Sequence, residues 1–328
     1  MARNKKGLPI DGIINLDKPL GLSSNQALQK VKKLLNAKKA GHTGSLDPLA
    51  SGVLPLCFGH ATKVSALLLD SDKGYLAGIH LGCRTTTGDK EGEIINPVNY
   101  SEIEKNKIVA ILKQFEGEQH QLPPMYSALK FQGQPLYKLA RKGIEIKRET
   151  REITIYSIKL IDYQYPQLVI DVRCSKGTYI RTLAEDIGTA LGCGAHLFSL
   201  RRVQAGSFLI ADSYTLEQLT ELQQQRKIET VLNGSDSVLL HLPRINLSKQ
   251  SADDIRLGRK ITIFVDSAVT KGNARLDYLT MDKLKINQSE EQLIRLYEQE
   301  LFIGLAQLQI DSSPDEIIYL LQPKRLFC

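Results

Sequence analysis

Two periodicities of apolar residues divide the chain into expected strands and helices. Apolar side chains at every second position predict strands over about residues 75–81 and 168–174. Apolar side chains three and four positions apart predict helices over about residues 24–39, 101–115 and 178–191. Beyond about residue 250 short strands predominate. The chain is therefore expected to mix helices and strands and to end in a small β-rich region.

One segment between two of these elements follows neither period. Residues 41–52 read GHTGSLDPLASG, and three glycines with one proline predict a loop. The loop gathers His42 and Asp47, and the proline after Asp47 keeps its backbone out of the helical region. A carboxylate presented in this way can act as a nucleophile, a general base or a metal ligand. The alternative is an Asp-Pro turn in which His42 has only a structural role.

Composition narrows the class of protein. The 328 residues are 42% hydrophobic and 24% charged, which is typical of a globular chain long enough for two domains. No apolar run approaches the roughly 18 residues of a membrane helix, and no secretory signal is readable. The five cysteines are widely spaced and form no CxxC pair, so neither a zinc site nor a disulfide framework is expected. These features predict a cytoplasmic protein without a structural metal.

The positive charge is concentrated in two stretches. The whole chain carries a formal charge of +7. Residues 1–40 hold nine Lys and Arg against two Asp, and residues 130–151 hold seven against two Glu. Clustered basic charge favours a polyanionic partner, because each neutralised phosphate releases counterions. Nucleic acid is therefore one explanation of the charge, and two solvated basic faces are the other.

Several motifs then occur in a specific order. The run GHTGSLDPLASGVLPLCFGHATK closely resembles the catalytic motif of TruB-type tRNA pseudouridine-55 synthases. Upstream, GIINLDKPLGLSS is similar to the family's lysine–proline signature. Downstream, KGY, RTTTGD, PPMYSALK, CSKGTYIRTL and LRR follow in the family's order, over about residues 11–206. Gly74 and Ser51 depart from the residues that are common at their positions, and neither is a proposed catalytic group.

The resemblance implies an architecture. A basic tail at residues 1–10 would precede a pseudouridine synthase-like catalytic domain at 11–245. That domain would be α+β, with a mixed, largely antiparallel sheet and flanking helices. Residues 246–328 would form a small β-rich domain similar to the PUA type, which binds RNA.

The resemblance also implies an activity. The chain would convert the uridine at position 55 in the T-loop of tRNA into pseudouridine, without a cofactor or a metal. Asp47 would be the essential carboxylate, ionised although shielded from water. Because burial alone raises the pKa of a carboxyl, a cation is needed beside it, and the resemblance assigns that role to Arg181. Tyr75 would stack on the target base and assist proton transfer from carbon 5.

Further residues match family positions near the substrate. His42 would insert where bases are displaced from the stack. Basic side chains around residues 30–39 and 138–151 would follow the phosphate backbone. A monomer acting on the T-arm of tRNA is expected, with no obligate protein partner and no membrane association. The supporting substrate-binding residues would be Lys18, Tyr179, Leu200 and Lys130.

Other functions remain open from the residues. A tRNA-binding folding chaperone would show the same basic stretches, but it needs no carboxylate paired with Arg181. An Asp-dependent hydrolase would need a second carboxylate or a metal. Asp89 and Glu91 could supply one, although their context TTTGDKEG predicts a polar turn. An RNA-guided synthase within a larger particle is a further alternative.

Overall fold

The computed structural model describes residues 7–95, 97, 100–264, 274–275, 292–313 and 316–327. The chain divides into two compact units, and each is described by itself. The first holds residues 1–8, 14–56 and 65–231; the second holds residues 232–328 together with 9–13 and 57–64. Three basic residues of the tail, Arg3, Lys5 and Lys6, lie outside the described residues.

Strands and short helices alternate up to residue 231. The strands are β1 (Gly12–Lys18), β2 (Ala40–His42), β3 (Ala50–Phe58), β4 (Lys73–Leu81), β5 (Arg84–Thr85), β6 (Ile94–Ile95), β7 (Gly117–Gln121), β8 (Lys130–Phe131), β9 (Gln134–Pro135), β10 (Arg151–Gln164), β11 (Gln167–Cys174), β12 (Ala195–Ala205) and β13 (Phe208–Leu209). The helices are α1 (Ser24–Leu34), α2 (Ser65–Leu69), α3 (Lys105–Lys113), α4 (Leu136–Ala140), α5 (Ile180–Leu191) and α6 (Leu216–Gln224), with 3-10 turns at Gly59–Lys63, Ile210–Asp212 and Ile228–Val231.

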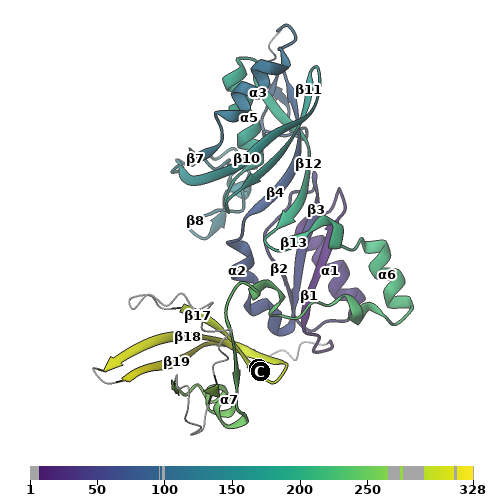
Figure 1. Cartoon of the computed structure of the whole chain (residues 1–328). Coiled ribbons are helices and arrows are strands. Elements are labelled where there is room, and N and C mark those ends of the chain that lie inside the picture. Colours follow the sequence, from purple (N-terminus) through teal and green to yellow (C-terminus); the bar gives the residue numbers. More distant parts are fainter. Residues whose placement is uncertain are drawn as a thin grey trace. The chain divides into compact units, whose positions relative to one another are not determined.

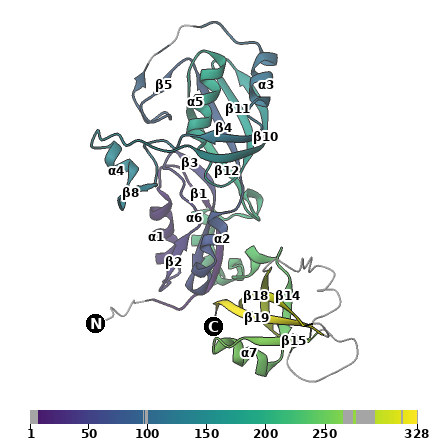
Figure 2. The ribbon, with the colours of Figure 1, turned by 90° about the vertical axis from the view of Figure 1, so that its left-hand side faces the viewer.

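A nine-stranded sheet organises the first unit (Figure 1). Its main order is β1-β3-β12-β4-β11-β10-β7, with β2 added to β3 and β13 to β12. The pair β3–β12 is parallel, whereas β12–β4, β4–β11, β11–β10 and β10–β7 are antiparallel. Helices α5 and α3 lie side by side against β12 and β10 (Figure 2). The expected α+β fold with a mixed, largely antiparallel sheet is confirmed.

Local sequence explains where the helices begin and end. Ser23 caps α1 and forms a capping box with Gln26, and the helix stops before Asn36, whose φ of 49° is left-handed. The helix is therefore shorter than the expected 24–39. The helix expected over residues 101–115 is also shorter, because α3 begins only at Lys105. Glu104 caps it without a side-chain hydrogen bond.

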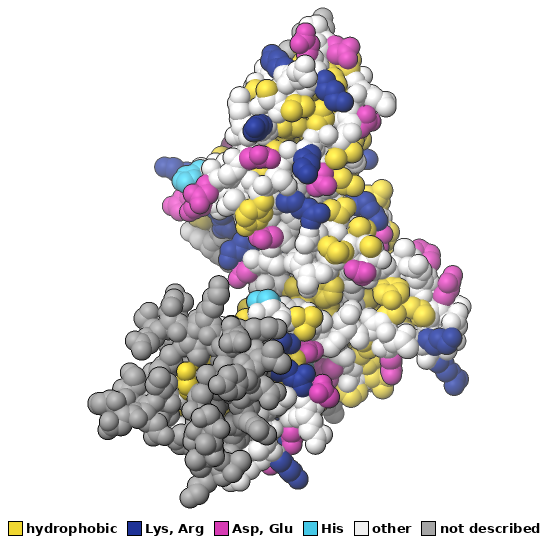
Figure 3. All heavy atoms as spheres, in the orientation of Figure 1, with side chains coloured by type: hydrophobic (Ala, Val, Ile, Leu, Met, Phe, Trp, Pro, Cys, Tyr) yellow, Lys and Arg dark blue, Asp and Glu magenta, His cyan; other side chains and the backbone are white. Residues whose placement is uncertain are grey.

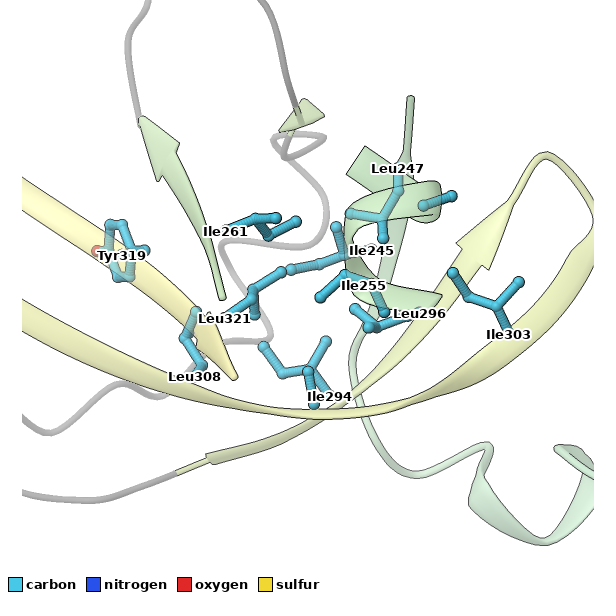
Figure 4. Close-up of a cluster of buried hydrophobic side chains, with 12 residues drawn as sticks. Ile245, Leu247, Ile255, Ile261, Ile294, Leu296, Ile303, Leu308, Tyr319 and Leu321 are labelled. Carbon is cyan, nitrogen blue, oxygen red and sulfur yellow. The ribbon is translucent and has the colours of Figure 1, made fainter. Parts of the chain in front are cut away.

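The second unit is built on a six-stranded sheet with the order β15-β19-β18-β17-β14-β16. Its elements are a 3-10 turn at Ser237–Leu239, β14 (Arg244–Leu247), α7 (Lys249–Arg256), β15 (Ile261–Phe264), β16 (Ala274–Arg275), β17 (Gln292–Glu298), β18 (Leu301–Ser313) and β19 (Glu316–Leu326). Figure 4 shows Ile255 of α7 beside Ile245 and Leu296, whose side chains are almost fully buried. Each such side chain stabilises the unit by roughly 1.5–3 kcal/mol. The expected β-rich C-terminal region is confirmed.

Gly52 allows β3 to approach β12 directly after the Asp47 loop. Its φ is +103°, and a Cβ there would lie 2.1 Å from the carbonyl oxygen of Arg202. Gly52→Ala should therefore lower the free energy of unfolding by about 2–4 kcal/mol, from backbone strain plus overpacking. Gly117 is a matched control, because its φ is +100° and nothing lies within 4 Å. Urea unfolding should show a smaller loss for Gly117→Ala; equal losses would contradict the close contact.

Candidate active site

The loop between β2 and β3 carries Asp47 and is anchored next to it. The buried hydroxyl of Ser24, at the start of α1, donates to the carbonyl of Leu46 at 3.1 Å and accepts its N–H at 2.7 Å. The side chains of Leu46 and Leu49 are buried on either side. The Asp47 side chain is 49% exposed. The carboxylate is thus held in place but is more open to water than the sequence led us to expect.

Arg181, the second residue of α5, faces this carboxylate. Its side chain is 9% exposed, and its Nη2 lies 3.0 Å from Oδ2 of Asp47. Nη2 also donates to the carbonyl of Tyr126 at 2.6 Å, while Nη1 donates to the carbonyl of Thr87 at 3.2 Å and to Oδ2 of Asp89 at 3.4 Å. Each terminal nitrogen therefore has two acceptors, which fixes the guanidinium plane and directs one edge at Asp47. The two residues that the resemblance pairs are in contact.

Asp89 is a second carboxylate on Arg181. Its side chain is 5% exposed. Its Oδ1 accepts the hydroxyl of Thr87 at 2.6 Å and the N–H of Glu91 at 3.1 Å, and its main-chain carbonyl accepts the hydroxyl of Thr85 at 2.6 Å. The polar turn that the sequence predicted is present, and it fixes a buried carboxylate against the arginine. Asp89 thus positions Arg181, which in turn faces Asp47.

Tyr75 lies on β4 opposite Arg202 on β12. The tyrosine is 8% exposed, and burial raises the pKa of its hydroxyl, although the charge of Arg202 and a hydrogen bond from it oppose the rise. Arg202 is 1% exposed and donates Nε to the carbonyl of Val53 at 2.6 Å. Its Nη2 is buried without a partner among the described residues. The protonated hydroxyl of Tyr75 therefore lies next to the buried guanidinium of Arg202, and the charge of Asp47 also acts on it.

Burial lowers the pKa of both Lys18 and His42, which favours their uncharged forms. The ammonium of Lys18 donates to the carbonyls of Pro19 at 2.8 Å and Leu22 at 2.6 Å. Burial lowers the Lys18 pKa to about 8, against an opposing effect of Asp47. Burial likewise lowers the His42 pKa, so its imidazole is neutral at pH 7. A neutral imidazole can stack on a base and also offer a hydrogen-bond acceptor.

The remaining expected residues differ in their placement. Tyr179 precedes α5, and its main chain exchanges hydrogen bonds of 2.7 and 3.0 Å with the side chain of Gln121. Burial raises the Tyr179 pKa, and Asp47 is among the charges acting on it. Leu200 of β12 pairs with Ala50, where the Asp47 loop enters β3. Lys130 is exposed on the β8–β9 hairpin and so belongs to the surface.

Family models match two adjoining segments of the chain. Residues 32–180 match the N-terminal domain of the TruB family of pseudouridylate synthases, and residues 181–240 match the C-terminal domain of tRNA pseudouridylate synthase B. A tRNA pseudouridine synthase B from Vibrio atlanticus is 42% identical, over 99% of this chain and 97% of its own length. One from Pseudomonas aeruginosa is 54% identical, over 74% of this chain and 81% of its own. The chain belongs to the TruB family. It is therefore a pseudouridine synthase, as the motifs predicted.

Solved structures agree with this assignment of the TruB chain. A complex of Cbf5, Nop10 and Gar1 matches with a TM-score of 0.71 at 25% identity, covering 97% of this chain and 85% of that one. An H/ACA RNP bound to a substrate RNA that contains 2′-deoxyuridine matches with a TM-score of 0.69 at 23% identity, covering 100% of this chain and 92% of that one. These likenesses support the fold of this TruB family member.

Three residues of the TruB site escaped the sequence analysis. Ser24 and Arg202 appear in the sequence only as members of motifs, and Asp89 only as a polar turn residue or the second carboxylate of a hydrolase. Arg202 did give a signal, because it shares a strand face with Leu200 and is therefore on the side that packs inward. The sequence does not indicate the contacts of Ser24 with Leu46 or of Asp89 with Arg181, since the fold alone brings these partners together.

The two basic stretches of the sequence place most of their lysines and arginines at the surface. Most of the basic side chains of both stretches are exposed, namely Lys30, Lys33, Lys38, Lys39, Lys130, Lys138, Arg141, Lys142, Lys147 and Arg151. In the coloured part of Figure 3, which shows described residues only, dark-blue and magenta side chains are interspersed, without a continuous patch of one sign. Among the described helices, none is long and apolar enough to cross a membrane.

The buried Lys18 predicts a pH dependence of stability. Its folded pKa of about 8 lies below the ordinary value of 10.5. Between these values the unfolded chain holds a proton that the folded chain has released, so stability gains with rising pH, by up to about 1.4 kcal/mol per pH unit. Urea unfolding should show the wild type gaining stability relative to Lys18→Met from about pH 7 to about pH 10. A constant or falling difference would contradict the buried ammonium.

Proposed function

We propose that this chain isomerises the uridine at position 55 in the T-loop of tRNA to pseudouridine, with Asp47 as the essential carboxylate. The contact between Asp47 and Arg181, held from behind by Asp89, is the observation that carries the proposal. It places an oriented carboxylate on a loop, at the edge of a buried polar cluster. The tRNA substrate agrees with the names of the curated relatives.

The reaction needs no net reactant besides the uridine. The bond from the ribose to N1 breaks, the base turns, and a bond forms from the ribose to carbon 5. Carbon 5 then loses its proton to solvent and N1 gains one, so the product has the same atoms as the uridine. Each route to this exchange needs one carboxylate at the junction of sugar and base, and Asp47 supplies it. The half-exposed face of Asp47 receives that junction, so the bound nucleotide completes the shielding from water. The proposed site uses no metal or cofactor.

The neighbouring residues would receive the base. Tyr75 forms the apolar floor of the site and takes part in removing the carbon 5 proton. His42, neutral and beside the loop, inserts where the target base leaves its stack. Lys18 of β1, Leu200 of β12 and Tyr179 before α5 support the bound nucleotide.

The surface groups would supply affinity rather than chemistry. Lys130 and the exposed basic side chains of both stretches would contact phosphates of the T-arm. We infer a basic tail at 1–10, a catalytic domain at 11–245 and a PUA-like RNA-binding domain at 246–328. The protein would act as a cytoplasmic monomer.

Tritium release tests this function. A tRNA transcript labelled at carbon 5 of its uridines should release one tritium per molecule to water, because a single base is isomerised. A transcript with cytidine in place of the uridine at position 55 is the matched control and should release none. Equal release from both transcripts would refute the assigned position, and no release from either would refute the reaction.

A further inference from the structure

Three potential metal ligands converge at the far end of β4 from Tyr75. His80 lies on β4, and its register partner on β12 is His196. Cys83 follows two residues after the end of β4. One ligand atom from each of the three side chains lies within 4.8 Å of the others. The cluster thus draws on two strands and the turn after one of them.

The spacing suits a tetrahedral metal. Sγ of Cys83 lies 3.6 Å from Nδ1 of His196. A tetrahedral zinc ion with bonds of about 2.3 Å to sulfur and about 2.05 Å to nitrogen sets its sulfur and nitrogen ligands about 3.6 Å apart. His80 completes the set after a movement on the order of 1 Å, since zinc holds two nitrogens about 3.3 Å apart. The two imidazole rings already lie 5.2 Å apart, centre to centre, with 21° between their planes.

One nitrogen of the cluster is left unsatisfied by the protein, and the other two side chains are buried beside it. Nδ1 of His80 is buried and has no hydrogen-bond partner among the described residues. Cys83 and His196 are 8% and 7% exposed. A buried polar atom without a partner costs free energy, and a metal ion would satisfy it. Nδ1 of His196 also lies 3.1 Å from the carbonyl oxygen of Cys83, so a metal would replace that contact.

We propose that His80, Cys83 and His196 bind one zinc(II) ion. Two imidazoles and one thiolate form a ligand set that zinc accepts, and a water molecule fills the fourth position. On binding, the thiol of Cys83 gives up its proton to the solvent and its sulfur bonds to the ion, while both histidines remain neutral. The sequence spacing 80, 83 and 196 matches no zinc motif because the third ligand comes from a distant strand.

The ion would stabilise the turn that carries Asp89. Leu197, next to His196, donates its N–H to the carbonyl of Gly88 at 3.0 Å and accepts the N–H of Lys90 at 2.9 Å. Zinc would therefore fix the segment 83–90 at its start, Cys83, while Leu197 already fixes its end at Gly88 and Lys90. Its role is structural, and its binding does not depend on the proposed tRNA reaction.

Metal binding to the full-length protein tests the site directly. The purified chain, stripped with a chelator and reduced, is dialysed against Zn²⁺ and its metal content is measured. Co²⁺ is then used as a spectroscopic probe, because a thiolate ligand gives a charge-transfer band in the near ultraviolet. We expect one ion per chain and a thiolate band. Cys83→Ala and His80→Gln should each weaken zinc binding by at least about tenfold. Losing a residue that only hydrogen-bonds to a metal ligand already costs roughly that much.

Cys193→Ala is the matched control. Cys193 is buried like Cys83 but stands outside the cluster, so this variant should bind zinc like the wild type and keep the cobalt band. Circular dichroism identifies any variant that fails to fold, and the partly exposed His80 position provides the more tolerant substitution. Less than one ion per chain in the wild type, a cobalt spectrum without the thiolate band, or equal binding by folded Cys83→Ala and His80→Gln would each overturn the proposal.

Discussion

Asp47→Asn should abolish pseudouridine formation, with turnover lower by roughly 10²–10⁴-fold or more. The amide keeps the size of the side chain but removes the negative charge that faces Arg181 at 3.0 Å. Binding of tRNA should change by less than about twofold, because phosphate contacts from surface lysines and arginines dominate affinity. Tritium release measures turnover, and filter binding of tRNA measures affinity.

Asp171→Asn is a suitable control for this variant. Asp171 also pairs with an arginine on a strand, at 3.8 Å from Nε of Arg173, and it has no place in the proposed site. Its turnover should match the wild type. If Asp47→Asn retained wild-type turnover, Asp47 would not be the essential carboxylate.

The same Asp47→Asn variant tests the alternative of a tRNA-folding chaperone. If the variant still refolds tRNA without turnover, a chaperone activity is separate from catalysis. If it loses both activities together, the support for a separate chaperone role is removed.

Arg181→Lys should lower turnover by roughly 10²-fold while tRNA affinity stays close to that of the wild type. The guanidinium places two nitrogens on four acceptors, including carboxylates on both sides. A single ammonium cannot satisfy Asp47 and Asp89 in this geometry, although it keeps the charge. Single-turnover measurements with excess enzyme separate the chemical step from binding.

Asp89→Asn gives the companion measurement for Arg181→Lys. The amide leaves the contact of Arg181 with Asp47 in place but removes the second carboxylate behind it. Its loss of turnover should be smaller than that of Arg181→Lys, and the double variant should lose less than the sum of the two free-energy effects, because both act through one contact. Fully additive losses would contradict a positioning role for Asp89.

Regular elements with a single clear period were the predictable part of the fold. The strand at 168–174 and the helix that ends before Gly192 were found at nearly the expected residues, since β11 is Gln167–Cys174 and α5 is Ile180–Leu191. Gly192 has a φ of 80°, as a left-handed helix end requires. Helix starts were less predictable, because the helix expected from residue 101 has a backbone that becomes helical only at Lys105.

Within the candidate site, only the residues to which a motif assigns a chemical role could be predicted. Asp47 and Arg181 met that condition. Ser24 and Asp89 also lie within the motifs, but their roles depend on contacts across 22 and 92 positions of the chain, which the motifs do not indicate. The exposure of Asp47 also depends on packing around the loop, which no local pattern encodes. Tertiary contacts therefore determine the precision of the site, whereas the sequence motifs determine which chemical groups are present.

Position-resolved mapping of pseudouridine in tRNA is the most direct test of the central claim. An unmodified tRNA transcript is incubated with the wild type or with Asp47→Asn, and each uridine is then tested for conversion. The proposed function predicts pseudouridine at position 55 with the wild type and none with the variant. Conversion confined to other positions, or conversion at position 55 that survives Asp47→Asn, would contradict it.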